Sequence, residues 1–298
     1  MWSTHSFRSA NNKVSTHMMN DVPDALRPSA LEALRGWSER VRANREQAEQ
    51  FREAAPADFY GPIAGMFRAD PRRQDEPTLE TLRSLVRASD TVLDIGAGGG
   101  RYSLPLALEA KEVIAVDPSE GMLRVLREGM AAYEIANIRV VSGRWPAVAS
   151  GLAADVVLIA HLGYDVEDIG PFLDAMEASA RRICVAVLLE QSPPAPADRL
   201  WPEVHGVERA ALPSLPEFLA LLLARGRLFE VRLVDRSPQS YEQPDQVLAW
   251  LRGQLWTQLD GPKDLLLQRL THKHLQQRNG RYALSWDPLR VGIVTWSA

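Results

Sequence analysis

The chain has 298 residues, of which 46% are hydrophobic and 24% charged, a composition that is ordinary for a folded globular protein. A formal net charge of -4 gives no overall attraction to phosphate backbones, so the sequence predicts that nucleic acid is an unlikely partner. The single cysteine, Cys184, excludes an internal disulfide and any metal site built from several cysteines. The longest apolar runs are too short to span a membrane and the polar N-terminal segment does not resemble a secretory signal, so we expect a cytoplasmic location and no membrane partner.

The first quarter of the chain is predicted to stand apart from the rest. Residues 1–20 are polar and predict a disordered tail. Ser29 is a suitable helix cap, and the apolar residues after it recur at helical spacing, which predicts a helix over 28–54. We therefore expect a helical N-terminal region over 21–76 and a main domain over 77–298.

From residue 77 onwards, short apolar strands alternate with amphipathic helices. The predicted strands are 91–95, 112–116, 138–141, 155–160, 182–189, 228–234 and 291–296. The predicted helices are 78–88, one beginning near 101, 119–133 and 215–225, and a mainly helical insertion at 235–290 contains 247–259 and 265–276. This alternation predicts an α/β fold with a parallel sheet and helices on both of its faces.

The glycine-rich segment 92–100, VLDIGAGGG, lies where a nucleotide-binding loop belongs, after a strand and before a helix. A dinucleotide site requires the spacing G-x-G-x-x-G. Counted from Gly96 the third position is Arg101, and counted from Gly98 it is Ser103, so that pattern fails in both registers. The spacing that fits is D-x-G-x-G-x-G.

Two carboxylates accompany this loop. Asp94 stands just before its first glycine, and Asp117 ends the next strand. S-adenosylmethionine (SAM) carries an ammonium and a sulfonium, so a carboxylate near the loop suits it, and a carboxylate at the end of the second strand can accept from both ribose hydroxyls. The alternative is a tight turn with two capping aspartates.

Two segments resemble the motifs of class I SAM-dependent methyltransferases, especially the methyltransferase domain type 11/25 group: VLDIGAGGGRYSLPLA (92–107) and VIAVDPSEGMLRVLRE (113–128). The resemblance covers roughly residues 85–190. It implies SAM as cofactor and a Rossmann-like, seven-stranded, mostly parallel sheet of strand order 3-2-1-4-5-7-6 with the last strand antiparallel. It also implies that the N-terminal helices form a lid over the cofactor.

The same resemblance assigns cofactor-binding roles to particular positions. Asp94, Gly96, Ala97 and Gly98 would shape the methionine side of the pocket, Asp117 would bind ribose, and Met122 would pack on adenine. The family often has Gly-Asp-Ala after the third strand, where this chain has Gly143-Arg144-Trp145. Arginine cannot accept a hydrogen bond from adenine, so Arg144 would contact its edge and Trp145 would stack on it, unless Trp145 is a core residue.

Catalytic candidates follow the fourth strand, whose carboxyl end faces the ligand crevice in such folds. His161 is the predicted general base and Tyr164 would orient the acceptor, although each could instead be structural. His205 could reach the same cleft. His272 and His274 do not share a helix face, so no metal site is predicted.

We therefore expect transfer of a methyl group from SAM to an O, N or C nucleophile of a small molecule. An RNA- or protein-modifying methyltransferase is an alternative, supported by basic residues in 263–290, although a solvated helix face would have the same composition. A SAM-binding protein without catalytic activity is a third alternative. The sequence indicates neither the acceptor nor the oligomeric state.

Overall fold

The structure is a computed structural model that describes residues 23–51, 70–74, 76–193, 195–236, 240–285 and 290–297. The tail predicted at 1–20 lies outside these residues, as do the last three residues of the helix predicted at 28–54. None of the described helices is both long and apolar enough to cross a membrane.

A seven-stranded sheet of order β3-β2-β1-β4-β5-β9-β6 forms the centre of the fold. Its last strand along the chain, β9, is antiparallel to both of its neighbours, and the other neighbouring pairs are parallel. The predicted strand order and the antiparallel last strand are therefore confirmed. The strands are β1 (Thr91–Ile95), β2 (Glu112–Asp117), β3 (Ile138–Ser142), β4 (Ala154–Ala160), β5 (Ala180–Leu189), β6 (Phe229–Asp235) and β9 (Arg290–Trp296).

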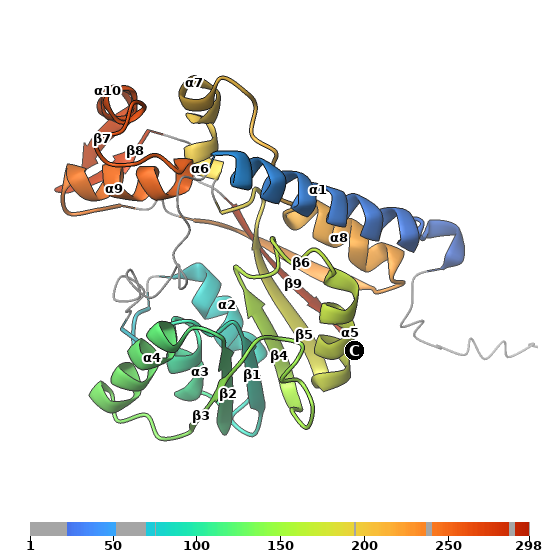
Figure 1. Ribbon diagram of the computed structural model, residues 1–298. Coiled ribbons are helices and arrows are strands. Elements are labelled where there is room, and N and C mark those ends of the chain that lie inside the picture. The colour runs from blue at the N-terminus through green and yellow to red at the C-terminus, as the bar shows by residue number, and fades with distance from the viewer. Residues whose placement is uncertain are drawn as a thin grey trace, which may run out of the picture.

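Helices cover both faces of this sheet (Figure 1). One face carries α2 (Pro77–Leu85), α3 (Ser103–Ala107) and α4 (Glu120–Ala132), whose apolar side chains form one core cluster with the strands. The opposite face carries α5 (Ile169–Ser179) and α8 (Leu215–Ala224), which contribute to a second cluster. The inner strands β1, β2, β4, β5 and β9 are mostly buried on both sides, which is why they appear in the sequence as apolar runs without alternation.

Local signals explain where α8 begins and ends. Ser214 and Glu217 form the predicted capping box, in which the backbone N–H of Ser214 donates to Glu217 Oε2 at 2.9 Å. Gly226 has a φ of +77°, a conformation that ends a helix and suits glycine. The prediction of a helix at 215–225 is thus confirmed to within one residue.

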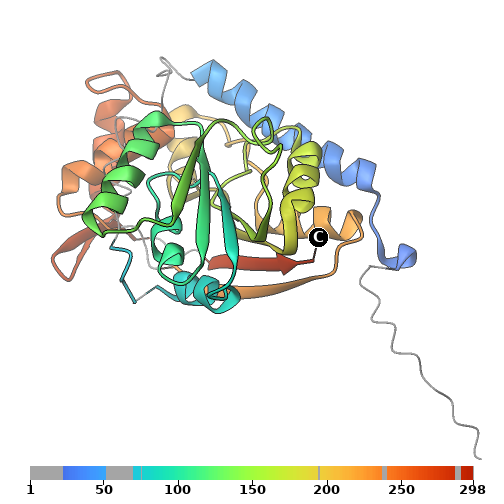
Figure 2. The ribbon, with the colours of Figure 1, turned by 90° about the horizontal axis from the view of Figure 1, so that it is seen from below.

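The N-terminal helix α1 (Ala30–Phe51) forms an extra layer outside α5 and α8, on the side of the sheet opposite to α4 (Figure 2). Trp37 anchors it: its indole N–H donates to the carbonyl of Val166 at 2.9 Å, and its ring packs edge-on against Phe218. A short 3-10 helix, η1 (Asp24–Leu26), precedes it. The described part of the predicted lid is therefore attached along the flank of the sheet.

A second group of elements, which we call the accessory module, comprises residues 195–209 and 240–285. Its helices α6, α7, α9 and α10 lie together at the top of Figure 1, and a separate apolar cluster holds them to a small hairpin. This cluster also includes Phe51 at the end of α1. The elements are α6 (Ala195–Asp198), α7 (Trp201–His205), α9 (Pro244–Leu255), α10 (Asp264–His274), β7 (Leu275–Arg278) and β8 (Arg281–Leu284).

The hairpin in this module was not predicted. Asn279 and Gly280 join its strands with φ angles of +51° and +75°, which is the pattern of a type I′ turn. Asn-Gly is a strong hairpin signal, but the helical periodicity before it extended the predicted helix over 265–276, whereas α10 ends at His274. The insertion at 235–290 is therefore helical with a hairpin at its end.

Candidate functional site

The candidate site lies at the carboxyl-terminal edge of the sheet, where the chain order reverses between β1 and β4. Ile95 at the end of β1 pairs with Val116 of β2 on one side and Ile159 of β4 on the other. The loops that follow these three strands therefore begin side by side. In open α/β sheets, ligands bind at this switch point.

The glycine-rich loop after β1 is fastened to the end of β2. The backbone N–H of Gly98 donates to Asp117 Oδ2 at 2.9 Å, and the N–H of Ser119 donates to Asp117 Oδ1 at 2.8 Å. Asp117 therefore fixes both the loop and the first turn of α4. Asp117, which was predicted to bind ribose, and the predicted glycine loop thus form one hydrogen-bonded unit.

Gly98 provides the observation that tests whether the loop fits SAM. Its φ is +55°, and among the described residues beyond its two chain neighbours, a Cβ built on it would have one neighbour within 4 Å, the Met122 sulfur at 4.0 Å. Gly100 differs, because a Cβ there would lie 2.5 Å from Leu126 Cδ1. Gly100 is thus required by packing, whereas Gly98 leaves space beside Asp117 and Met122 that a ligand can occupy, and these residues fit the cofactor.

Asp94 lies beneath the loop and is buried. Its Oδ2 accepts from Ser103 Oγ at 2.6 Å, which links the end of β1 to the first turn of α3. Burial raises the pKa of Asp94 to about 6, and the negative charge of Asp117 adds to this shift. The carboxylate therefore holds the loop in place from below, and a role toward the methionine group of SAM stays a prediction.

The two positions predicted to meet adenine lie in different surroundings. The indole of Trp145 is 7% exposed and donates to the carbonyl of Phe172 at 3.1 Å, which is the core position considered as its alternative. Arg144 is exposed in the loop after β3. No helix lies between β3 and β4. In its place the Trp145 side chain packs against Phe172 of α5.

His161, the predicted base, follows β4 with a φ of +55°, and its backbone N–H donates to the carbonyl of Val187 at 2.8 Å. Its ring centroid lies 6.5 Å from that of Tyr102, and its Nδ1 is buried without a hydrogen-bond partner among the described residues. Burial and the charges of Arg236 and Arg101 lower the pKa of His161 to about 3. The imidazole is therefore neutral at physiological pH and a weak base.

Tyr164 is buried between the loop after β4 and the end of β5. Its hydroxyl accepts a hydrogen bond from the backbone N–H of Leu189 at 2.8 Å, at the end of β5, and its ring is 4% exposed. His205 belongs to the accessory module, where its Nε2 lies 2.8 Å from the carbonyl oxygen of Leu255 and its Nδ1 lies 2.9 Å from Lys263 Nζ. The roles of both side chains in catalysis stay predictions.

Several groups near the site were not singled out from the sequence. Glu76 accepts hydrogen bonds from Arg73, Arg101 and Tyr102, and so ties the segment before α2 to the loop after β1. Arg236 follows β6 directly, and its charge acts on both His161 and Tyr164. A polar residue just after a strand was the available signal for Arg236, but only tertiary structure places the end of β6 near the end of β4.

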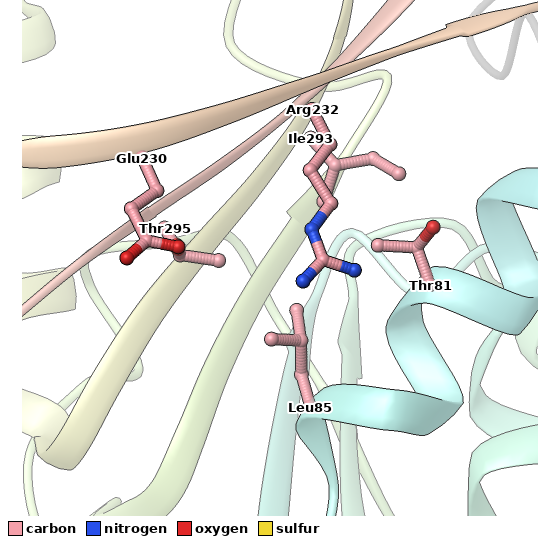
Figure 3. A pocket seen from close by; sticks show the side chains of 6 residues that line it. All are labelled: Thr81, Leu85, Glu230, Arg232, Ile293 and Thr295. Atoms are coloured by element: carbon pink, nitrogen blue, oxygen red, sulfur yellow. The ribbon is translucent and has the colours of Figure 1, made fainter.

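A small pocket elsewhere is not part of this site. It lies between α2 and the middle of β6 and β9, where the side chain of Arg232 extends toward Leu85 and Thr81 (Figure 3). Its lining residues are Thr81, Leu85, Glu230, Arg232, Ile293 and Thr295, none of which was predicted to bind a ligand.

Fold and loop together resemble those of class I SAM-dependent methyltransferases in the part of the chain that carries the glycine loop. A family model described as a methyltransferase domain matches residues 92–182, which run from β1 into β5. The structure of the YcgJ protein from Bacillus subtilis has a similar fold, with a TM-score of 0.51 and 18% identity over 74% of this chain and 97% of that one.

Curated relatives match about a quarter of the chain. A probable cobalt-precorrin-6B C(15)-methyltransferase (decarboxylating) from Methanocaldococcus jannaschii is 30% identical over 80 residues, which are 24% of this chain and 44% of that protein. The ribosomal RNA small subunit methyltransferase G of Neisseria gonorrhoeae is 37% identical over 79 residues, which are 26% of this chain and 38% of that protein. The match thus spans less than half the length of either relative.

These relatives overturn one expectation. Net charge predicted that nucleic acid is an unlikely partner, yet relatives include ribosomal RNA methyltransferases, among them a probable ribosomal RNA small subunit methyltransferase A from Methanosphaera stadtmanae. The prediction was wrong because overall charge says nothing about a local acceptor surface.

Proposed function

We propose that this protein transfers a methyl group from SAM to a nucleophilic O, N or C atom of an acceptor. The observation that carries the proposal is the unit formed by Gly98, Asp117 and Met122, in which a glycine with positive φ leaves space beside a carboxylate. The positive φ of Gly98 favours glycine, and the lack of a Cβ there also lets a ligand approach the backbone. The match of the methyltransferase domain model to residues 92–182 supports the same reading.

SAM supplies an already activated methyl group on its sulfonium, so the protein's tasks are to align the acceptor and to exclude water. In this chain, Asp117 and Gly98 would position the cofactor, and the residues after β4 would face the acceptor. His161 is neutral, and it can therefore donate or accept one hydrogen bond without carrying charge into the site. An acceptor that arrives as a neutral amine or a thiolate needs no stronger base.

The acceptor class is open between a small metabolite and RNA. The cobalt-precorrin relative supports the first and the ribosomal RNA methyltransferases support the second, and these matches cover about a quarter of the chain. The basic stretch 263–290 supports RNA less than its composition suggests, because Lys263 contacts His205 and Arg281 pairs with Glu242. A cytoplasmic location stays a prediction.

Titration calorimetry with S-adenosylhomocysteine (SAH) tests the cofactor site. We expect wild-type protein to bind SAH at micromolar concentration and Asp117→Ala to bind it about 100-fold more weakly, since hydrogen bonds to a charged group are worth about 1.5–3 kcal/mol each. Glu112→Ala is the matched control, because it removes a carboxylate from the opposite end of the same strand.

Thermal unfolding of the three proteins controls for loss of fold, since Asp117 also holds the loop. Failure of well-folded wild-type protein to bind SAH would refute the proposal. SAH binding combined with no methyl transfer to any acceptor, in screens that include both metabolites and RNA, would instead favour a non-catalytic SAM-binding protein.

A further inference from the structure

Arg236 occupies an unusual place at the carboxyl-terminal edge of the sheet. It follows the last residue of β6, and Val234 of β6 shares its β9 partner, Val291, with Leu189 at the end of β5. The ends of β5 and β6 therefore lie at the same level, at the edge where the loops after β1 and β4 begin. This placement brings the Arg236 guanidinium from the edge strand β6 to the end of the sheet where His161 follows β4.

Arg236 is half-buried and forms no hydrogen bond or ion pair with the described residues. Other partly or fully buried arginines in the structure each bond to a carboxylate: Arg209 to Asp198, Arg225 to Glu177 and Arg252 to Asp264. Burial lowers the pKa of Arg236, and the nearby charge of Arg101 acts in the same direction. The carboxylate of Glu76 acts on Arg236 through space but forms no ion pair with it, so among the described residues the donors of this half-buried guanidinium are free to bind an anionic ligand.

Two further polar atoms near Arg236 lack partners. The Nδ1 of His161 and the hydroxyl of Tyr241 are both buried, and neither has a hydrogen-bond partner among the described residues. The charge of Arg236 contributes to lowering the pKa of His161 and opposes the rise that burial gives the pKa of Tyr241, so both side chains lie within electrostatic reach of it. Buried polar groups normally have partners, and a ligand that reaches all three would supply them.

We propose that Arg236, together with Tyr241 and His161, binds an oxyanion of the methyl acceptor, either a carboxylate or a phosphate group. The planar guanidinium can donate two parallel hydrogen bonds to such a group, and the tyrosine hydroxyl and a neutral imidazole N–H can donate one each. The three side chains come from the end of β6, the start of the accessory module and the loop after β4.

Assignment of this site to the acceptor rests on the proposed function and on the sheet order. SAM also carries a carboxylate, and Arg101 and Glu76 beside the glycine loop act on Arg236, although β4, β5 and β9 separate β6 from β1 in the sheet. Arg101 is the nearer cation to the glycine loop, and it is already paired with Glu76. The cofactor's carboxylate is therefore the competing occupant that the experiment must distinguish.

The experiment uses the full-length protein saturated with SAH, titrated with benzoate, phenyl phosphate and the neutral analogue benzamide. We expect at least one anion to bind wild-type protein and to bind Arg236→Gln at least about 10-fold more weakly, the loss typical of a removed charge-assisted hydrogen bond. Arg232→Gln is the matched control, because it lies in the same strand and its side chain extends toward Leu85 and Thr81 instead (Figure 3). The anion that binds more tightly shows whether the acceptor presents a carboxylate or a phosphate.

Separate titrations keep this inference distinct from the proposed function. Wild-type binding of SAH tests the cofactor site alone and does not depend on Arg236. 5′-Methylthioadenosine lacks the carboxylate of SAH. If Arg236→Gln lowers the affinity for SAH but leaves the affinity for 5′-methylthioadenosine unchanged, the guanidinium binds the cofactor and the inference is overturned. It is equally overturned if neither anion binds wild-type protein better than benzamide, or if the anions bind Arg236→Gln as tightly as wild type.

Discussion

At the scale of single residues, His161 shows how position alters the chemistry expected from residue type. A histidine after β4 predicts a general base, yet burial and two nearby arginines lower the pKa of its imidazole to about 3. Its φ of +55° lies in the left-handed region, which is uncommon for residues other than glycine, although histidine adopts it more often than most. The side chain is therefore held neutral at a strained backbone position, a combination that is common at functional sites.

This pKa predicts acid sensitivity. Because the folded-state pKa lies below the unfolded value near 6.5, the unfolded chain binds the proton first, and stability falls as the pH drops from about 6.5 towards 3. At pH 5 the cost is about 2 kcal/mol relative to pH 7.5, from about 1.4 kcal/mol per pH unit below 6.5. Urea unfolding should show that His161→Asn, which tolerates positive φ, loses about 2 kcal/mol less than wild type over this range. Equal losses in both proteins would contradict the assigned pKa.

At the scale of elements, the loop after β1 contains glycines with different tasks. A Cβ built on Gly100 would lie 2.5 to 3.1 Å from the side chains of Leu126 and Leu104, whereas among the described residues a Cβ on Gly98 would approach only the Met122 sulfur, at 4.0 Å. One glycine lets α3 and α4 pack closely, and the other keeps the backbone accessible to a ligand. The sequence pattern does not separate these two roles, because both positions are required for the same motif.

Because the two glycines have different surroundings, alanine should mainly weaken SAH binding at Gly98 and mainly reduce stability at Gly100. Gly98→Ala should cost about 1 kcal/mol of stability, the strain of a left-handed alanine, but should weaken SAH binding at least about 10-fold because its methyl group occupies ligand space. Gly100→Ala should destabilise the protein by about 3 kcal/mol through overpacking and strain. Chemical denaturation and SAH titration of both variants provide the check, and SAH binding by Gly98→Ala at wild-type strength would remove this glycine from the cofactor site.

At the scale of the whole molecule, the sheet and the accessory module have separate apolar clusters. Within the module, Asp264 accepts two hydrogen bonds from Arg252, at 2.8 and 3.1 Å, and one from Gln268 at 2.9 Å, and the residue is 1% exposed. These bonds lower the pKa of Asp264 to about 2, so the carboxylate stays charged throughout the physiological range. The ion pair joins α9 to α10. Because the module has its own apolar cluster, we expect loss of this ion pair to destabilise the module more than the sheet.

We expect Asp264→Asn to destabilise the module by about 3 kcal/mol, because it leaves the Arg252 guanidinium without its counter-ion. Hydrogen exchange should accelerate in residues 195–209 and 240–285 and stay unchanged in β1, β4 and β5. Asp245→Asn is the control, since it makes the same substitution at an exposed position in α9. Faster exchange spread evenly over the sheet would show instead that the two parts unfold together.

Sequence by itself determined the sheet and the cofactor loop. The alternation of strands and helices predicted a parallel sheet, and the resemblance to class I SAM-dependent methyltransferases implied its strand order. The loop was visible because its glycines and Asp94 are close together in the chain. Even the missed hairpin carried a local signal in Asn279 and Gly280. These features depend on residues within a few positions of one another.

Only the tertiary structure decided what depends on distant segments. It placed Trp145 against α5, attached α1 along α5 and α8, and joined 195–209 to 240–285 in one module. It also brought Arg236 to the edge where His161 lies. Sequence periodicity tells which face of an element is apolar but not which distant element covers it, and so the acceptor side of the site became visible only when the ends of β4, β5 and β6 were aligned.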